Sequence, residues 1–98
     1  MANQDILRTE NVLVRLMPLE KGASTDWHYH TEVTDFFVGM KGAVTVEAKN
    51  PDETQTLHPG QHSEVKPYRI HRVVNDHDGT SEYLLVQGVG TYDFIKVP

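Results

Sequence analysis

The 98-residue sequence contains no cysteine. Disulfide bonds, zinc–thiolate sites and iron–sulfur clusters are therefore excluded, and any metal site must be built from histidine and carboxylate ligands. Runs of Lys or Arg are also missing, and the formal net charge is -5 at pH 7. This balance argues against a nucleic-acid-binding or anionic-membrane surface, since either would need a basic patch.

Long apolar runs are missing as well, and all fall far short of the roughly 18 residues of a membrane-spanning helix. Residues 1–10 lack the basic segment and apolar stretch of a secretory signal. We therefore expect a cytoplasmic protein without a membrane partner. A chain of this length forms one domain with a small core, and pairing with a second copy would bury more surface, so we expect a homodimer.

Helical periodicity is the third absence, because no 11-residue window carries apolar residues at helical spacing. Short runs rich in β-branched and aromatic residues are present instead, separated by turn residues. Strands are predicted at residues 11–19, 27–30, 35–40, 43–48, 54–57, 61–65, 69–75, 82–87 and 91–97. Short strands with a turn about every 8–12 residues are typical of an all-β sandwich or barrel. We therefore predict an all-β fold with little or no helix.

One stretch of the chain gathers polar side chains with metal-binding chemistry. His28 and His30 are one residue apart, so a strand would point both side chains to the same face. Asp35 follows at the start of an apolar run, and His71 in a later run could complete the group. Imidazoles and a carboxylate on one face suit a divalent transition metal. We predict one such ion, namely Mn, Fe, Ni or Zn.

The same stretch, with its spacing, resembles the first motif of the cupin superfamily, in particular that of its small single-domain members. That motif is Gly, five residues, His-x-His, three or four residues, Glu, six residues and Gly. This sequence gives Gly22, five residues, His28-Tyr-His30, four residues, Asp35, six residues and Gly42. Every spacing fits, with Asp in the place of Glu.

A second stretch, residues 60–75, resembles the second cupin motif, which is Gly, five residues, Pro-x-Gly, two residues, His, three residues and Asn. The sequence matches its Gly, His and Asn positions with Gly60, His71 and Asn75. The Pro-x-Gly turn differs, because Lys66 and Tyr68 stand where Pro and Gly would be. Two gapped motifs in the right order are a more specific signal than His-x-His alone.

The resemblance implies a single-domain cupin-type β-barrel, a double-stranded β-helix or jelly roll, over residues 1–98. It also implies that His28, His30, Asp35 and His71 bind one metal ion inside the mouth of this barrel. Asp reaches one methylene less far than Glu, which leaves two alternatives for its carboxylate. It is either a direct ligand or an acceptor that supports three histidine ligands.

Other residues near the two motifs have less specific signals. Tyr68 and Arg69 lie beside the expected barrel mouth and are candidates for contact with a substrate. We interpret Trp27, Phe37 and Tyr83 as core aromatic residues and Asn75 as a residue that fixes a loop. None of these side chains is an evident general acid or base.

A metal held in this way can act as a Lewis acid or bind a substrate directly. Within the cupins the same ligand set serves dioxygenases, decarboxylases and other lyases, isomerases and non-enzymatic sensors. One hypothesis is a metal-dependent enzyme that acts on a small oxygenated metabolite, such as a carboxylate. The alternatives are a small-molecule-binding sensor without turnover and a metal-free cupin without catalysis.

Overall fold

The computed structural model describes residues 3–98 and contains ten β-strands there, nine of which fall on the predicted strand-forming runs. The strands are β1 (Gln4–Arg8), β2 (Val12–Leu19), β3 (His28–Tyr29), β4 (Thr34–Lys41), β5 (Val44–Ala48), β6 (Glu53–Leu57), β7 (His62–Val65), β8 (His71–Val74), β9 (Ser81–Gly88) and β10 (Ile95–Lys96). Residues 3–98 contain no helix, so no helix there could cross a membrane. The prediction of an all-β fold is confirmed.

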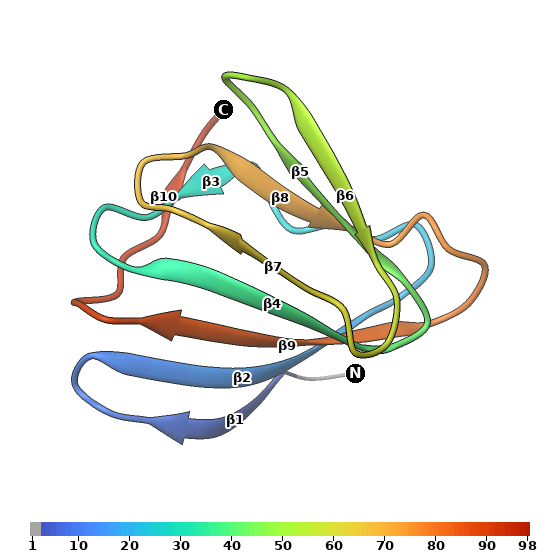
Figure 1. Cartoon of the computed structure of the whole chain (residues 1–98), viewed down its shortest axis with the longest axis horizontal. Coiled ribbons are helices and arrows are strands. Elements are labelled where there is room, and N and C mark those ends of the chain that lie inside the picture. Colours follow the sequence, from blue (N-terminus) through green and yellow to red (C-terminus); the bar gives the residue numbers. More distant parts are fainter. Residues whose placement is uncertain (1–2) are drawn as a thin grey trace.

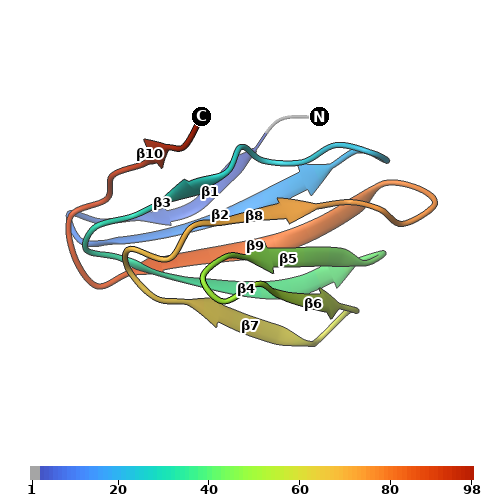
Figure 2. The ribbon, with the colours of Figure 1, turned by 90° about the horizontal axis from the view of Figure 1, so that it is seen from above.

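The strands form two five-stranded antiparallel sheets, with the orders β1-β2-β9-β4-β7 and β10-β3-β8-β5-β6. From β2 onward the chain passes repeatedly between the two sheets, which gives the double-stranded β-helix, or jelly-roll, arrangement (Figure 1). In Figure 2 the chain leaves β9, folds back along one end of the molecule, and brings β10 beside β3. The predicted cupin-type barrel is therefore confirmed.

The hydrophobic core lies between the sheets, at the inward-facing positions next to the polar residues of the motifs. Its buried side chains are Phe37, Val44, Val46, Leu57, Val65, Val73, Tyr83 and Leu85. On β4 and β9, Asp35 stands opposite Gln87, and the next inward pair is Phe37 and Leu85. Phe37 and Tyr83 pack with ring centroids 5.9 Å apart, as the core interpretation predicted. Trp27 is instead half-buried outside this core, with Lys49 and Arg72 over its ring. One inward-facing rung therefore carries polar chemistry and the next is apolar.

The two ends of the chain differ from the sequence prediction. Strand β1 was not predicted, because all five of its side chains are exposed and show no alternation between polar and apolar residues. The strand predicted at residues 91–97 shrinks to the two residues of β10. Within it, Tyr92 and Phe94 line an interior cavity, so much of this segment covers the barrel end and forms no ladder.

The backbone conformation and hydrogen bonds of the motif turns explain why glycine and asparagine stand at their positions in the two motifs. Gly42 has a φ of 65°, and a Cβ placed there would lie 2.6 Å from the Ser81 Oγ, so the turn needs glycine. Tyr68, at the position of the second-motif glycine, also adopts a positive φ of 67°. The Asn75 amide donates to the carbonyls of Leu19 and Gly79 at 2.8 Å each, which supports its loop-fixing role.

Candidate metal centre

The four residues predicted to bind metal come together from both sheets. His28 on β3 stands directly opposite His71 on β8, and His30 follows the end of β3. Asp35 reaches the same place from β4 in the other sheet. All four side chains are buried, and one potential ligand atom of each lies within 4.8 Å of the others. The fold therefore brings two distant motifs into one group that could hold a metal ion.

Backbone carbonyl groups orient the three imidazole rings. The Nδ1 of His28 contacts the Asp26 carbonyl at 2.6 Å, and the Nδ1 of His71 contacts the Arg69 carbonyl at 2.8 Å. The Nδ1 of His30 contacts the carbonyl of Asp93. A carbonyl oxygen only accepts, so each Nδ1 must carry the donated proton. In each neutral ring the Nε2 is therefore left as the electron-pair donor, which is the form that binds a metal.

Asp35 is the anionic member of the group. Its Oδ2 lies 2.9 Å from the Nε2 of His30 and 2.8 Å from the Nε2 of His71. Its Oδ1 accepts a 2.8 Å hydrogen bond from the Gln87 amide. The shorter Asp side chain therefore reaches the imidazole nitrogens that the resemblance to cupins assigns to the metal.

The protonation of the group follows from burial and from these contacts. Burial lowers the pKa of His28 from 6.5 to about 4, so this ring is neutral at pH 7. Burial alone would lower the pKa of His30, but the hydrogen bond to Asp35, the charge of Asp35 and the contacts with Asp93 together outweigh it and raise this pKa above 6.5. Burial alone would raise the pKa of Asp35, but hydrogen bonds from His30 and His71 hold it well below 3.8. Asp35 is therefore ionised at neutral pH.

A divalent metal fits these residues on two grounds. First, three oriented imidazoles and one carboxylate form a nitrogen and oxygen donor set that suits Mn, Fe, Ni or Zn. Second, the Oε1 of Gln87 is buried and has no hydrogen-bond partner among the described residues. Such an acceptor is costly to leave unpaired, so it indicates that a donor from a bound ligand or water belongs beside it.

The C-terminal segment that follows β9 covers this group. The Phe94 ring stacks on His28, with centroids 4.1 Å apart and planes 17° from parallel. The carboxylate of Asp93 accepts hydrogen bonds from the backbone nitrogen of Thr31 at 2.8 Å and from its hydroxyl at 2.5 Å. These bonds fix the Asp93 carbonyl that orients His30. Residues 92–94 therefore shield one ligand and position another.

A cavity of about 190 Å³ lies against the group, between the sheets. Its apolar wall includes Phe37, Leu85 and Phe94, and its polar lining includes Arg15, Tyr83, Gln87 and Tyr92. This volume is below the roughly 300–1,000 Å³ of pockets for drug-sized ligands. The cavity is therefore suited to a small metabolite.

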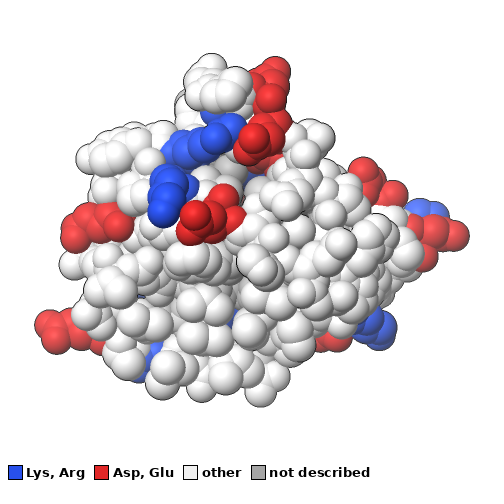
Figure 3. Space-filling view, in the orientation of Figure 1, with Lys and Arg blue, Asp and Glu red and all other residues white. Residues whose placement is uncertain are grey.

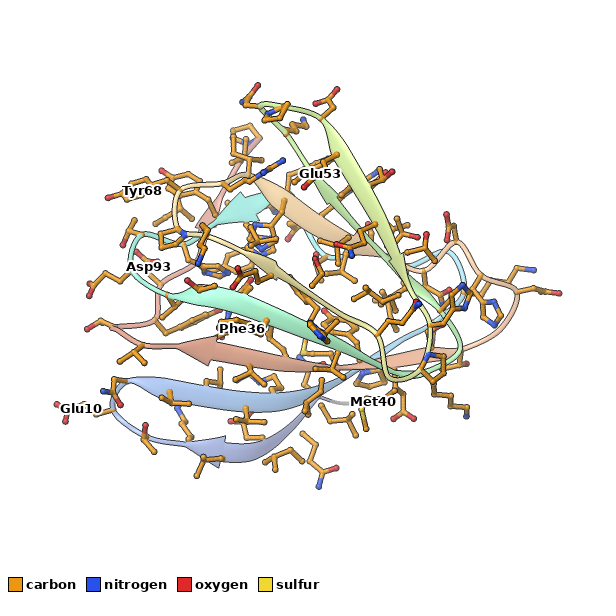
Figure 4. The ribbon with its side chains drawn as sticks, viewed as in Figure 1. Glu10, Phe36, Met40, Glu53, Tyr68 and Asp93 are labelled. Carbon is orange, nitrogen blue, oxygen red and sulfur yellow. The ribbon has the colours of Figure 1, made fainter. Side chains whose placement is uncertain are left out.

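The two predicted substrate contacts do not line this cavity. The Tyr68 side chain is 70% exposed, stacks on Tyr29 and points outward in Figure 4. The guanidinium of Arg69 donates to the Pro51 carbonyl at 2.9 Å and lies 3.4 Å from Glu53. Arg69 lines a separate depression, formed by residues of the β5–β6 hairpin and of β7. Only its carbonyl, which orients His71, contributes to the centre.

Several residues at the cavity and the centre were not predicted from the sequence, and only some of them carry a signal in it. Arg15 and Gln87 are polar residues at inward positions of otherwise apolar strands, so the alternation of β2 and β9 could have identified them. Asp93 and Phe94 carry no such signal, because the residues that they contact lie more than 60 positions earlier in the chain. Their role depends on how the C-terminal segment crosses the barrel end.

Comparisons with known proteins agree with this fold. Search of the solved structures finds a protein with a double-stranded β-helix domain from Klebsiella pneumoniae, with TM-score 0.85, 18% identity, and coverage of 99% of this chain and 84% of that one. A sugar phosphate isomerase of the cupin superfamily from Silicibacter pomeroyi gives TM-score 0.70 and 21% identity, with coverage of 88% and 68%. Oxalate oxidase gives TM-score 0.81 and 16% identity, with coverage of 90% and 47%.

These identities are low, so the structural matches show the fold and not a shared activity. A search of curated proteins found no significant match. The family model described as "Cupin domain" matches residues 15–87, which is most of the chain and includes both motifs. Fold, motif spacing and this match agree, and the chain belongs to the cupin family.

Proposed function

We propose that the protein is a small metal-dependent cupin that acts on a small oxygenated metabolite bound in its cavity. The metal ligands are His28, His30 and His71, with Asp35 as the anionic fourth ligand. The observation that carries this proposal is the convergence of the four ligand atoms within 4.8 Å, with His28, His30 and Asp35 at the wall of the cavity. Residues 1–98 act as a single domain in this proposal.

A divalent transition metal in this centre would supply Lewis-acid chemistry or a direct binding position for substrate oxygen. The chain's own side chains hold and orient the bound molecule. Burial raises the pKa of Tyr83 and of Tyr92 above 10, so both phenols keep their protons at neutral pH. They can donate hydrogen bonds to substrate oxygens, but they do not abstract protons. Phe37 and Phe94 give the cavity apolar walls, which exclude water from it.

The reaction classes we consider are those expected from the sequence, namely dioxygenase, decarboxylase or other lyase, and isomerase. The similar structures include an oxalate oxidase and a sugar phosphate isomerase, so this fold serves more than one chemistry in other proteins. In both of these names the substrate is a small oxygen-rich molecule. This supports the proposed substrate class for the present chain.

A sensor that binds the same molecule without turnover is the second candidate. The observation that favours it is the cavity lining, where the described residues outside the ligand group provide no base that would be free at neutral pH. A substrate screen on metal-loaded protein separates the two candidates. Steady turnover that is lost in His28→Ala would establish the enzyme, and saturable binding without turnover would establish the sensor. Neither turnover nor binding would overturn both.

We further propose that the protein is a homodimer, for which the outer face of the β2, β9 and β4 sheet provides a surface. One cross-strand row on this face carries Leu7, Val14, Val86 and Phe36, and the adjacent row carries Leu16, Leu84 and Val38. Figure 3 shows that charged side chains gather above this region and at the margins. A contiguous apolar patch of this kind is typical of an interaction surface. The cytoplasmic location stays a prediction.

A further inference from the structure

Arg15 places a positive charge in the cavity beside the metal centre. The inward side chains of β2 are otherwise apolar, with Leu13 buried and Met17 and Leu19 packed against the core. Among the described residues that line the cavity, Arg15 is the one Lys or Arg. A charged group at such a position is costly, so it requires a partner or a ligand.

The position of Arg15 relative to the centre follows from the strand register. Arg15 stands opposite Leu85 on β9, which is two residues from Gln87. Gln87 in turn donates to Asp35 at 2.8 Å. Two residues along a strand correspond to roughly 7 Å. Arg15 therefore belongs to the rung next to the proposed metal ligands, and it lines the same small cavity as His28, His30 and Asp35.

The partner of Arg15 in the structure is a carboxylate from the exposed edge strand. The Nε of Arg15 lies 2.5 Å from the Oδ1 of Asp5, which stands directly opposite on β1. The Asp5 side chain is 40% exposed, whereas that of Arg15 is 23% exposed. A partly exposed ion pair contributes little to stability, so another carboxylate could replace Asp5 at low cost. This contact uses the Nε of Arg15, so neither of its Nη groups takes part in it.

The charges around the cavity also favour an anion. A dication held by Asp35 and three neutral imidazoles would leave one net positive charge, and Arg15 adds a second once Asp5 is displaced from it. The apolar wall formed by Phe37, Leu85 and Phe94 lowers the local dielectric and strengthens these interactions. Arginine binds carboxylates with two parallel hydrogen bonds, which also fixes their orientation.

We propose that Arg15 anchors the carboxylate of the substrate, which is a small 2-hydroxy or 2-oxo carboxylate whose other oxygen faces the metal centre. Asp5 occupies the guanidinium until the substrate carboxylate displaces it. This inference rests on the proposed function and makes it more specific, because it names the substrate class and the residue that selects it.

The test measures binding by calorimetry on zinc-loaded protein. The probes are glycolate, lactate and pyruvate, each compared with its neutral amide. We expect the carboxylates to bind more tightly than the amides, and Arg15→Gln to weaken carboxylate binding about tenfold or more without changing amide binding. Arg15→Lys keeps the charge and should restore part of the affinity. Asp5→Asn should strengthen carboxylate binding, because it removes the competing carboxylate.

Arg8→Gln is the matched control, because Arg8 also contacts Asp5, at 3.5 Å, but lines a different depression. It should leave carboxylate binding unchanged. A purely structural role of Arg15 would lower the melting temperature and weaken acids and amides alike, which would overturn the proposal. So would a wild-type protein that binds zinc but does not distinguish lactate from lactamide, and in that case the metal centre would stand. Protein that binds no zinc would overturn the proposed function as well.

Discussion

At the scale of single residues, the centre depends on which atom each side chain presents. Each histidine donates its Nδ1 proton to a backbone carbonyl, so all three rings present Nε2 to the group. The sequence predicted which residues come together, because the spacing of two motifs carries that information. It could not predict the ring orientation, because the carbonyl that orients His30 belongs to Asp93, far along the chain.

Asp35 provides the first prediction. Asp35→Asn keeps the shape of the side chain but removes its negative charge, so we expect zinc affinity to fall about 10- to 100-fold. Zinc titration with a competing chelator measures this change. Asp78→Asn is the control, because its side chain is 91% exposed on a distant turn. Unchanged affinity in Asp35→Asn would mean that its carboxylate does not take part in binding the metal.

His30 provides a prediction on pH. Its pKa is raised above 6.5 in the metal-free protein, so a proton competes for the ring at mildly acidic pH, and metal binding must release it. His28, with a pKa of about 4, is already neutral there and does not compete. Zinc affinity should therefore fall by up to about tenfold per pH unit below the pKa of His30. Calorimetry at about pH 7.5 and about pH 6 tests this, and equal affinities would contradict it.

At the scale of secondary-structure elements, the internal strands could be predicted from their runs of β-branched and apolar residues, and the two terminal strands could not. Strands β2, β4, β5 and β9 have inward faces that are mainly apolar, and their predicted ranges match the structure closely. Strand β1 is entirely exposed, so burial left no pattern in its sequence. The C-terminal segment was predicted as a strand, but most of it covers the metal centre.

The C-terminal segment provides an element-scale prediction. Asp93→Ala removes the two hydrogen bonds to Thr31 and so releases the carbonyl that orients His30. We expect zinc affinity to fall about tenfold, the size of effect found when groups that orient a metal ligand are lost. Asp52→Ala, on the exposed turn between β5 and β6, is the control. If both variants bound zinc like the wild type, this segment would not position the ligand.

At the scale of the whole molecule, the length of the chain predicted a single domain and its short strand-like runs predicted an all-β fold. The spacing of the two motifs added the type of barrel. The cavity could not be predicted, because its lining comes from both sheets and the C-terminal segment. The same holds for the apolar patch on the outer face, since it exists only once β2, β9 and β4 are in register.

The apolar patch provides a prediction on assembly. Phe36 belongs to this patch and is 41% exposed, so Phe36→Glu should introduce a buried charge into the dimer interface and yield a monomer. Analytical ultracentrifugation measures the change. Ile95→Glu, at a similar 38% exposure on the other sheet, should remain dimeric. A wild-type protein that sediments as a monomer at all concentrations would contradict the proposed homodimer.

The most direct test of the metal centre is the metal content of the protein purified without chelators, compared with that of His71→Ala. Both motifs must contribute to the group, so the wild type should contain about one divalent transition metal ion per chain. His71→Ala should lose most of it while it keeps its β-sheet circular dichroism spectrum. Wild-type protein that stays without metal after incubation with Mn, Fe, Ni and Zn salts, or a His71→Ala variant with full metal content, would contradict the account.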